Sequence, residues 1–414
     1  MRIVDVLTEP VRAGFFADDQ AAVRAGAPHD GFSYEGSPLT PGFTAIRQAG
    51  EALSVLLLLD DGSVAHGDCA AVQYSGAGGR DPVFSAESAR RDIAQHLTPL
   101  LAGAELTSFR DLAGRVDGHP LHSAIRYGVT QAVLDAVAQS RRLTMAEVVR
   151  DEYATGVDLR PVPMFAQCGE DRYGGVDKMI LKRVGVLPHG LINHVGTLVG
   201  HRGELFEDYV RWLVGRIAEL NTDSGYLPRL YFDTYGTIGQ AFDGDVDAVA
   251  AYLAGLAKIA APHELVIEHP IDAGSRDAQV ATYVRLRAAL KRLGSPVKIA
   301  VDEWCNTLDD IKLFVDNEAA DVIHVKTPDL GGITNTIEAL LLVRDRGLFA
   351  YCGGTCNETD RSAQVTAHLA MACAAGQILA KPGMGVDEGL MIVGNEMTRV
   401  AAITAARPSV VVSP

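Results

Sequence analysis

The sequence predicts an α/β protein in which a (β/α)8-type barrel follows a smaller N-terminal α+β capping domain. From about Pro161 onward, eight short apolar segments alternate with amphipathic helical ones, as in parallel barrels. Before that point strand-like segments come first and helical segments follow, which is typical of an α+β domain. The 414 residues are enough for a barrel of roughly 250 residues and a companion domain. We therefore expect domains at residues 1–160 and 161–414.

The N-terminal domain is expected to begin with a strand at Arg2–Val6 and a loop rich in glycine and proline through Gly42. A β-hairpin should follow, because the arms SVLLLL and SVAHGD flank Asp60-Asp61-Gly62, a turn signal. Apolar residues then recur at spacings of three and four. This pattern predicts helices at Ala86–Leu101, Leu106–Val116 and His122–Gln139.

Eight segments rich in apolar and β-branched residues are the candidate barrel strands. They are Val162–Gln167, Met179–Val184, Arg229–Asp233, Leu265–Glu268, Lys298–Asp302, Val322–Lys326, Leu348–Cys352 and Gln377–Ala380. Helices are expected between most of them, at Phe206–Leu220, Asp245–Ile259, Ala278–Leu293 and Thr334–Arg346. In such barrels the chemistry lies where the strands end and the next loops begin.

Composition and charge limit the partners of the protein. A formal net charge of −15 argues against nucleic acid and against an anionic membrane surface. The longest apolar run, Val55–Leu59, is too short to span a bilayer. Asp5 and Glu9 lie where a signal peptide would need an apolar core. The six cysteines form no CxxC pair, so we expect reduced thiols and a cytoplasmic location.

Three of the expected strands end in a carboxylate, at Asp233, Glu268 and Asp302, and the next one ends in Lys326. Since one helix separates each strand from the next, these side chains should lie side by side at one rim. Clustered carboxylates repel one another unless their pKa values rise or a cation lies among them, and oxygen ligands suit Mg²⁺. Burial should lower the pKa of Lys326 and make it available as a base. A base beside a metal can remove a proton α to a carboxylate.

Simpler explanations are open for these residues. The three acids could cap the helices that follow them, and Lys326 could extend its ammonium group to solvent from a strand end. The glycine-rich segment Gln73–Arg80 is either a flexible connection or a mobile flap over a site. A barrel with only a binding or structural role should have lost one of the acids or the lysine, and none is missing.

The barrel, its strand-end acids and Lys326 resemble the enolase superfamily, and the detailed sequence resembles its methylaspartate ammonia-lyase family. The stretches that carry the resemblance include QYSGAGGRDPVF, MFAQCGEDRYGGVDKMI, VLPHGLINHV, FDTYGTIGQAFD, IEHPID, VDEWCNTLDDIK, VKTPDLGG, YCGGTCNETDRSA and KPGMGVDEGLMIVGNEM. They span nearly the whole expected barrel and extend into the N-terminal domain. YCGGTCNET together with VKTPDLGG is highly specific.

The resemblance implies a carbon–nitrogen lyase that eliminates ammonia from an amino-dicarboxylate, (2S,3S)-3-methylaspartate, to give mesaconate, reversibly and through a metal-stabilised enediolate. It implies Mg²⁺ at Asp233, Glu268 and Asp302, and Lys326 as the base that takes the C3 proton. His189, expected in the loop after the second strand, would serve the other C3 epimer and help hold the substrate carboxylate. A need for K⁺ and a homodimer are further implications.

The resemblance also implies residues that contact the substrate or line its pocket: Gln167, Thr355, Cys356, Gln73 and Leu379. Exposed N–H groups in the GGTC segment suit a substrate carboxylate, although Thr355 and Cys356 also fit plain turn positions. Gln167 also fits a polar position at a strand end. A nucleophilic role for Cys356 is disfavoured because no histidine base lies near it in the sequence.

One position departs from the family pattern. Two residues before Lys326 the family usually carries a glutamine that contacts substrate, and this chain has His324. Imidazole cannot present the donor and acceptor pair of an amide, so we hypothesise a different substrate preference or pH profile. The alternative function is another enolase-superfamily lyase or dehydratase that acts on a different carboxylate. The K-x-K motif or His–Asp dyad typical of dehydratases and cycloisomerases is not found at the corresponding strands.

Overall fold

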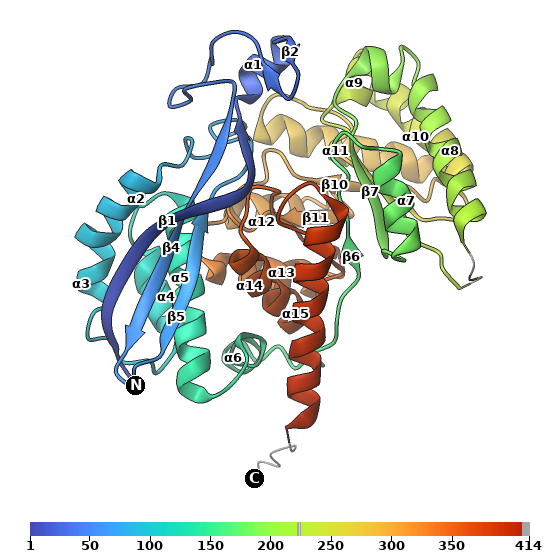
Figure 1. The fold of residues 1–414 in the computed structure, drawn as a ribbon. Helices are drawn as coiled ribbons and strands as arrows, with labels where there is room; N and C mark the ends of the chain where they lie inside the picture. Colours follow the sequence, from blue (N-terminus) through green and yellow to red (C-terminus); the bar gives the residue numbers. More distant parts are fainter. Residues whose placement is uncertain (222, 224, 408–414) are drawn as a thin grey trace.

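The computed structural model describes residues 1–221, 223 and 225–407 (Figure 1). Its N-terminal part is built on an antiparallel sheet in the order β1-β4-β5, with β1 at Ile3–Asp18, β4 at Arg47–Leu59 and β5 at Val64–Ala70. The predicted hairpin is confirmed, with residues 60–63 as its turn. Alternate residues of β4 are buried because one face of the sheet packs against helices.

The first strand is longer than predicted. β1 pairs with β4 as far as Asp18, where the sequence predicted a loop. Half of the residues of β1 are exposed, and the strand lacks the regular alternation of apolar and polar residues that identifies a half-buried strand. The rest of the predicted loop contains helix α1 (Gln20–Arg24) and two short strands, β2 (His29–Asp30) and β3 (Ser33–Tyr34).

Helices cover one face of this sheet (Figure 1). The long helix α5 (Ser123–Arg141) packs on β5, and Gly128 permits the close approach because a Cβ there would lie 2.3 Å from the Cys69 nitrogen. The other elements are α2 (Ala86–Asp92), the π-helical turn η1 (Ile93–Leu97), α3 (Thr98–Leu101), α4 (Phe109–Asp117) and α6 (Met145–Glu152). The three predicted helices are confirmed, the first of them with a π-helical turn inside it.

In the described part of the chain, eight parallel strands close a barrel. They are β6 (Met164–Phe165), β7 (Val186–Leu191), β8 (Arg229–Asp233), β9 (Leu265–Glu268), β10 (Lys298–Val301), β11 (Val322–Val325), β12 (Phe349–Cys352) and β13 (Gln377–Leu379). The predicted barrel is confirmed. Residues 408–414, at the end of the expected second domain, lie outside the described residues.

Helices alternate with the strands around the barrel (Figure 1). They are α7 (Gly174–Leu181), the π-helical turn η2 (Val195–Val199), α8 (Glu204–Leu220), α9 (Thr237–Ala241), α10 (Val246–Ala260), α11 (Arg276–Arg292), α12 (Leu308–Asp316), α13 (Ile333–Asp345), α14 (Asp360–Ala372) and α15 (Val386–Ala406). Among the described residues, none of these helices combines the length and apolar character that crossing a bilayer requires.

The second barrel strand was predicted wrongly. Met179–Val184 was expected to be a strand, but Met179 lies in helix α7 and the strand is β7. A short apolar run fits a buried helix face as well as a strand, so the pattern alone could not decide. As a result His189 lies inside β7 and not in a loop after a strand.

Each barrel strand contributes one side chain to a compact inner cluster. The cluster consists of Phe165, Val186, Tyr231, Val266, Ala300, Val322, Tyr351 and Leu379. The rings of Phe165, Tyr231 and Tyr351 contact one another within it. The barrel is therefore packed through its middle, which leaves polar chemistry to the rim where the strands end.

Candidate active site

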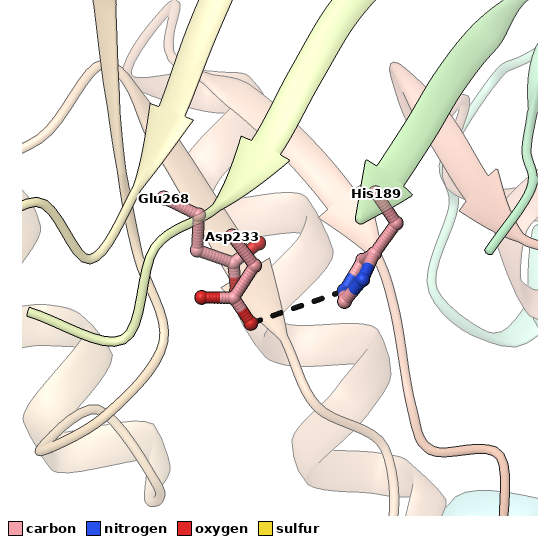
Figure 2. A group of neighbouring side chains, drawn as sticks. All are labelled: His189, Asp233 and Glu268. Carbon is pink, nitrogen blue, oxygen red and sulfur yellow. Dashed lines mark ion pairs between the residues drawn. The ribbon is translucent and has the colours of Figure 1, made fainter. Parts of the chain in front are cut away.

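The rim carries the three acids of the sequence analysis on neighbouring strands. Asp233 and Glu268 are the last residues of β8 and β9 and pair in register, and Asp302 directly follows β10. All three are at most 3% exposed. Figure 2 shows the side chains of Asp233 and Glu268 projecting together from the ends of their strands. Lys326 directly follows β11, the next strand in the barrel order.

The donor set fits a divalent cation. Burial, and then the mutual repulsion of the carboxylates, raises the pKa values of Asp233 and Glu268 well above their ordinary range. Glu268 Oε2 is buried, and no other described residue hydrogen-bonds it. Burial alone would raise the pKa of Asp302, but Lys326, His324 and Arg80 hold it below the usual value. Buried hard oxygen atoms that repel one another are the arrangement that Mg²⁺ stabilises.

Lys326 contacts one of these acids directly. Its Nζ donates to Asp302 Oδ2 at 2.5 Å. Burial works to lower the pKa of Lys326, as the sequence led us to expect, but the Asp302 carboxylate outweighs burial and the pKa is raised. The expected depression of the Lys326 pKa is therefore wrong.

His189 lies opposite Lys326. Four steps around the barrel separate β11 from β7, so the two residues face each other across its mouth. His189 adopts a positive φ of 64°, and its Nε2 lies 3.9 Å from Asp233 Oδ2 (Figure 2). Its Nδ1 is buried and forms no hydrogen bond with any of the described residues. Burial, with the positive charge of Lys326 nearby, lowers the pKa of His189 to about 3, so the ring is neutral.

A cavity between these strands brings together nearly all the residues that the sequence indicated. Its lining includes Gln73, Gln167, His189, Asp233, Asp302, His324, Lys326, Thr355, Cys356 and Leu379. Glu268 does not line the cavity, but its Oε1 lies 2.8 Å from the Nδ1 of His324, which does. The N-terminal part of the chain contributes Val72, Gln73, Tyr74 and Arg80 to the lining, and the barrel contributes the rest.

His324 is already engaged in the structure. Its Nδ1 lies 2.8 Å from Glu268 Oε1, and its Nε2 accepts the Gly354 N–H at 3.3 Å. Its ring stacks on Tyr351 with 4.2 Å between the centroids. Because Nε2 accepts, the proton belongs on Nδ1, which points it at Glu268. His324 thus lies against a candidate metal ligand as well as the cavity.

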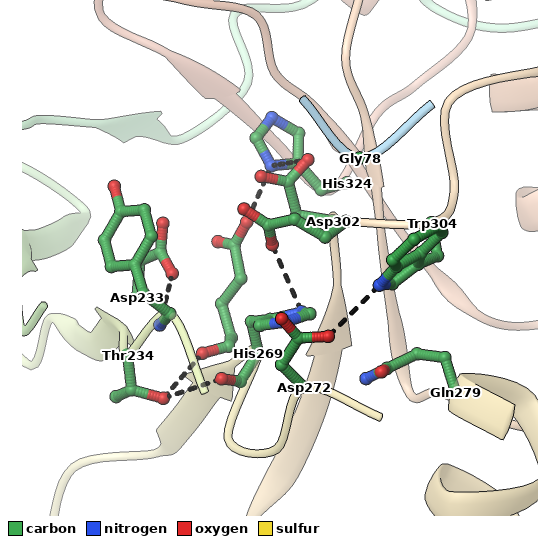
Figure 3. A network of polar contacts seen from close by, with 12 residues as sticks. Gly78, Asp233, Thr234, His269, Asp272, Gln279, Asp302, Trp304 and His324 are labelled. Carbon is green, nitrogen blue, oxygen red and sulfur yellow. Dashed lines mark hydrogen bonds and ion pairs between the residues drawn. The ribbon is translucent and has the colours of Figure 1, made fainter. Parts of the chain in front are cut away.

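Sequence reasoning missed two residues of the site. Arg80, at the end of the glycine-rich segment, is buried and donates to Asp329 at 2.8 Å and Asp302 at 3.4 Å. Glu303 lines the cavity, and its Oε2 lies 3.1 Å from the Nδ1 of His269. Figure 3 shows His269, whose role the sequence did not explain, within the polar network that also includes Asp302 and His324. The one available signal for Arg80 was its position at the end of the glycine-rich segment, and Gln73, Tyr74 and Arg80 of that segment line the cavity.

Comparison with solved structures gives the class of the protein first. Muconate cycloisomerase from Pseudomonas fluorescens shares the fold with a TM-score of 0.60 at 17% identity, over 89% of this chain and 84% of that one. At this identity the likeness shows the fold class alone, a closed barrel of eight parallel strands preceded by a smaller N-terminal part. Family models described as methylaspartate ammonia-lyase N-terminus and C-terminus match residues 1–154 and 156–406. The chain belongs to the methylaspartate ammonia-lyase family, whose members are carbon–nitrogen lyases.

Two relatives are similar over their whole length. The methylaspartate ammonia-lyase of Clostridium tetanomorphum is 54% identical over 412 residues, which is 98% of this chain and 100% of the relative. The crystal structure of that β-methylaspartase as its Mg complex matches with a TM-score of 0.94, over 99% and 100% of the two chains. The Citrobacter amalonaticus enzyme, solved with (2S,3S)-3-methylaspartic acid, is 49% identical with a TM-score of 0.95, over 98% and 100%.

Proposed function

We propose that this protein eliminates ammonia from (2S,3S)-3-methylaspartate to give mesaconate, and that it catalyses the reverse addition. The observation that carries the proposal is the placement of Lys326 and His189 on opposite sides of a cavity at the barrel mouth, close to three buried carboxylates. The similarity to relatives of that name over the full chain supports the choice of substrate.

Lys326 is the proposed base. In its neutral form Nζ takes the proton from C3, the electrons of that bond form the C2=C3 double bond, and the C2–N bond breaks as ammonia leaves. The lysine at the end of β11 faces the cavity from one side only, so it can reach only one face of C3. His189, neutral and on the opposite side, is suited to take a proton from the other C3 epimer.

Asp233, Glu268 and Asp302 are the residues that would hold Mg²⁺. A bound ion supplies positive charge that offsets these carboxylates and stabilises the negative charge that develops on the substrate carboxylate. We include K⁺ as a second cation in this proposal on the family resemblance alone.

The remaining predicted residues are proposed to hold the substrate. Thr355 and Cys356 lie in the loop after β12, where backbone N–H groups suit a carboxylate. Gln167 lies beyond β6 and donates to the Gly383 carbonyl at 3.2 Å, so its amide oxygen is available to the cavity. Leu379 supplies an apolar wall.

Three broader features belong to the same proposal. We propose a boundary between the capping domain and the barrel near residue 160. It lies between the end of the N-terminal family-model match at 154 and the first barrel strand, and the C-terminal match begins at 156. We propose a homodimer from the family resemblance. We propose a cytoplasmic location because the six cysteines are free and buried.

Ultraviolet absorbance tests the function directly. Purified protein with Mg²⁺, K⁺ and 3-methylaspartate should produce a rise in the band of an unsaturated dicarboxylate, and EDTA should abolish it. A flat trace with protein that binds Mg²⁺ would contradict the substrate assignment. It would favour the alternative, an enolase-superfamily lyase or dehydratase acting on another carboxylate.

A further inference from the structure

Gln73 lies between the cavity and the N-terminal sheet. It is 7% exposed and lines the cavity beside Thr355 and Cys356. Its backbone is held on both sides, because its N–H donates to Thr355 Oγ1 at 3.3 Å and its carbonyl accepts the Asp18 N–H at 3.0 Å. The backbone position of Gln73 is therefore fixed, and only the orientation of its side-chain amide depends on further contacts.

Two contacts decide that orientation. The Nε2 of Gln73 donates to Asp18 Oδ2 at 2.8 Å, and its Oε1 accepts the Cys356 thiol at 3.3 Å. A carboxylate can only accept hydrogen bonds, so a reversed amide would place two oxygen atoms against each other. The nitrogen must face Asp18, and the oxygen must face Cys356 and the cavity.

Asp18 is itself fixed by an arginine on the neighbouring strand. Asp18 ends β1 and pairs across the sheet with Arg47, the first residue of β4. The guanidinium donates to both carboxylate oxygens, at 2.8 and 2.7 Å, and donates to the Phe32 carbonyl at 2.8 Å. The Asp18 side chain is 2% exposed and that of Arg47 is 9% exposed. This two-point contact fixes the position of the Asp18 carboxylate.

We infer that Asp18, held by Arg47, is a positioning residue that turns the Gln73 amide oxygen toward the cavity to accept a hydrogen bond from the substrate's ammonium group. The inference rests on the proposed function. A thiol is a weak donor, so an ammonium N–H can replace it at Oε1 with a stronger, charge-assisted bond. In the addition direction the same oxygen receives the incoming ammonia.

Steady-state kinetics of ammonia addition to mesaconate test this role, because only one of the two reactants carries the nitrogen. Asp18→Asn can donate as well as accept, so it removes the constraint on Gln73 with little change of shape. We expect the KM for ammonia to rise at least about fivefold and the KM for mesaconate to stay within about twofold. Asp18→Asn added to Gln73→Ala should cause no further change.

Asp68→Asn is the matched control. Asp68 is a buried acid of the same sheet that accepts from Ser54 at 2.6 Å and does not contact Gln73. Its variant should leave both KM values within about twofold. Should Asp18→Asn fail to fold, Arg47→Lys breaks the two-point contact and should give the same selective rise.

Equal increases in both KM values, or no change in either, would overturn the inference while the wild-type enzyme remains active. A further rise when Asp18→Asn is combined with Gln73→Ala would also overturn it, because Asp18 would then act independently of the amide. An inactive wild-type protein would refute the proposed function and this inference together.

Discussion

The Nζ of Lys326 lies 2.5 Å from the Oδ2 of Asp302. The contact joins the proposed base to a proposed metal ligand, and Arg80 approaches the other oxygen of the same carboxylate at 3.4 Å. The proposed base, a proposed metal ligand and Arg80 of the glycine-rich segment thus meet at one buried side chain.

Lys326→Ala should lower kcat by about 10² to 10⁴-fold, the range that general base catalysis contributes. Mg²⁺ binding, measured by isothermal titration calorimetry, should be retained because the three carboxylates remain. Lys312→Ala is the matched control, since Lys312 is an exposed lysine that forms an ion pair with Asp309 on the same helix. An active Lys326→Ala variant would refute the base assignment.

Removal of the metal should be visible in stability as well as in activity. An ion that binds only the folded protein stabilises it by about 2.7 kcal/mol at a concentration 100 times Kd, so Mg²⁺ should raise the thermal midpoint and EDTA should reverse the rise. Glu268→Gln should lose most of this shift, whereas Glu219→Gln, at an exposed site, should keep it. An equal shift in both variants would count against Glu268 as a ligand.

His324→Gln tests the position at which this chain departs from its family. The imidazole spans Glu268 and the Gly354 N–H, and a glutamine amide would present its donor and acceptor differently. We expect the ratio of kcat/KM for 3-methylaspartate and aspartate, or the pH profile, to change. If the variant matches the wild type in both measurements, the hypothesis about His324 is wrong.

A buried ion pair supports the loop beside the active site. The side chains of Lys381 and Glu358 are both fully buried, and Lys381 Nζ lies 2.7 Å from Glu358 Oε2. The same Nζ donates a hydrogen bond to the Oγ1 of Thr327, the residue after Lys326, at 3.0 Å. Lys381→Met leaves Glu358 uncompensated, so we expect a loss of about 3–5 kcal/mol in the free energy of unfolding. Denaturant titration measures it, and a double variant Lys381→Met with Glu358→Leu should recover part of the loss.

Recovery in the double variant separates the two explanations of that loss. An unpaired buried charge is relieved when its partner is also replaced, whereas damage to packing is not. If the double variant is less stable than Lys381→Met, the loss comes from packing. If Lys381→Met unfolds at the wild-type midpoint, the ion pair does not stabilise this loop.

The barrel could be predicted from the sequence because apolar segments that end in polar residues recur along the chain. Asp233, Glu268 and Lys326 could be assigned to one rim, since parallel strands end at the same side. The second strand could not be predicted, because Met179 fits a buried helix face as well as a strand. The length of β1 could not be predicted either, because the strand is held by its pairing with β4 and shows no regular alternation of apolar and polar residues.

The barrel, the rim of acids, the lysine and the family resemblance could all be predicted from the amino-acid sequence, because each depends on local pattern or on short motifs. Which groups meet could be seen only in the folded protein. Asp18 and Gln73, Arg80 and Asp302, and His269 and Glu303 are each brought together by the approach of separate elements. Hydrogen bonds and buried charge depend on distances of a few ångströms, and packing fixes those distances.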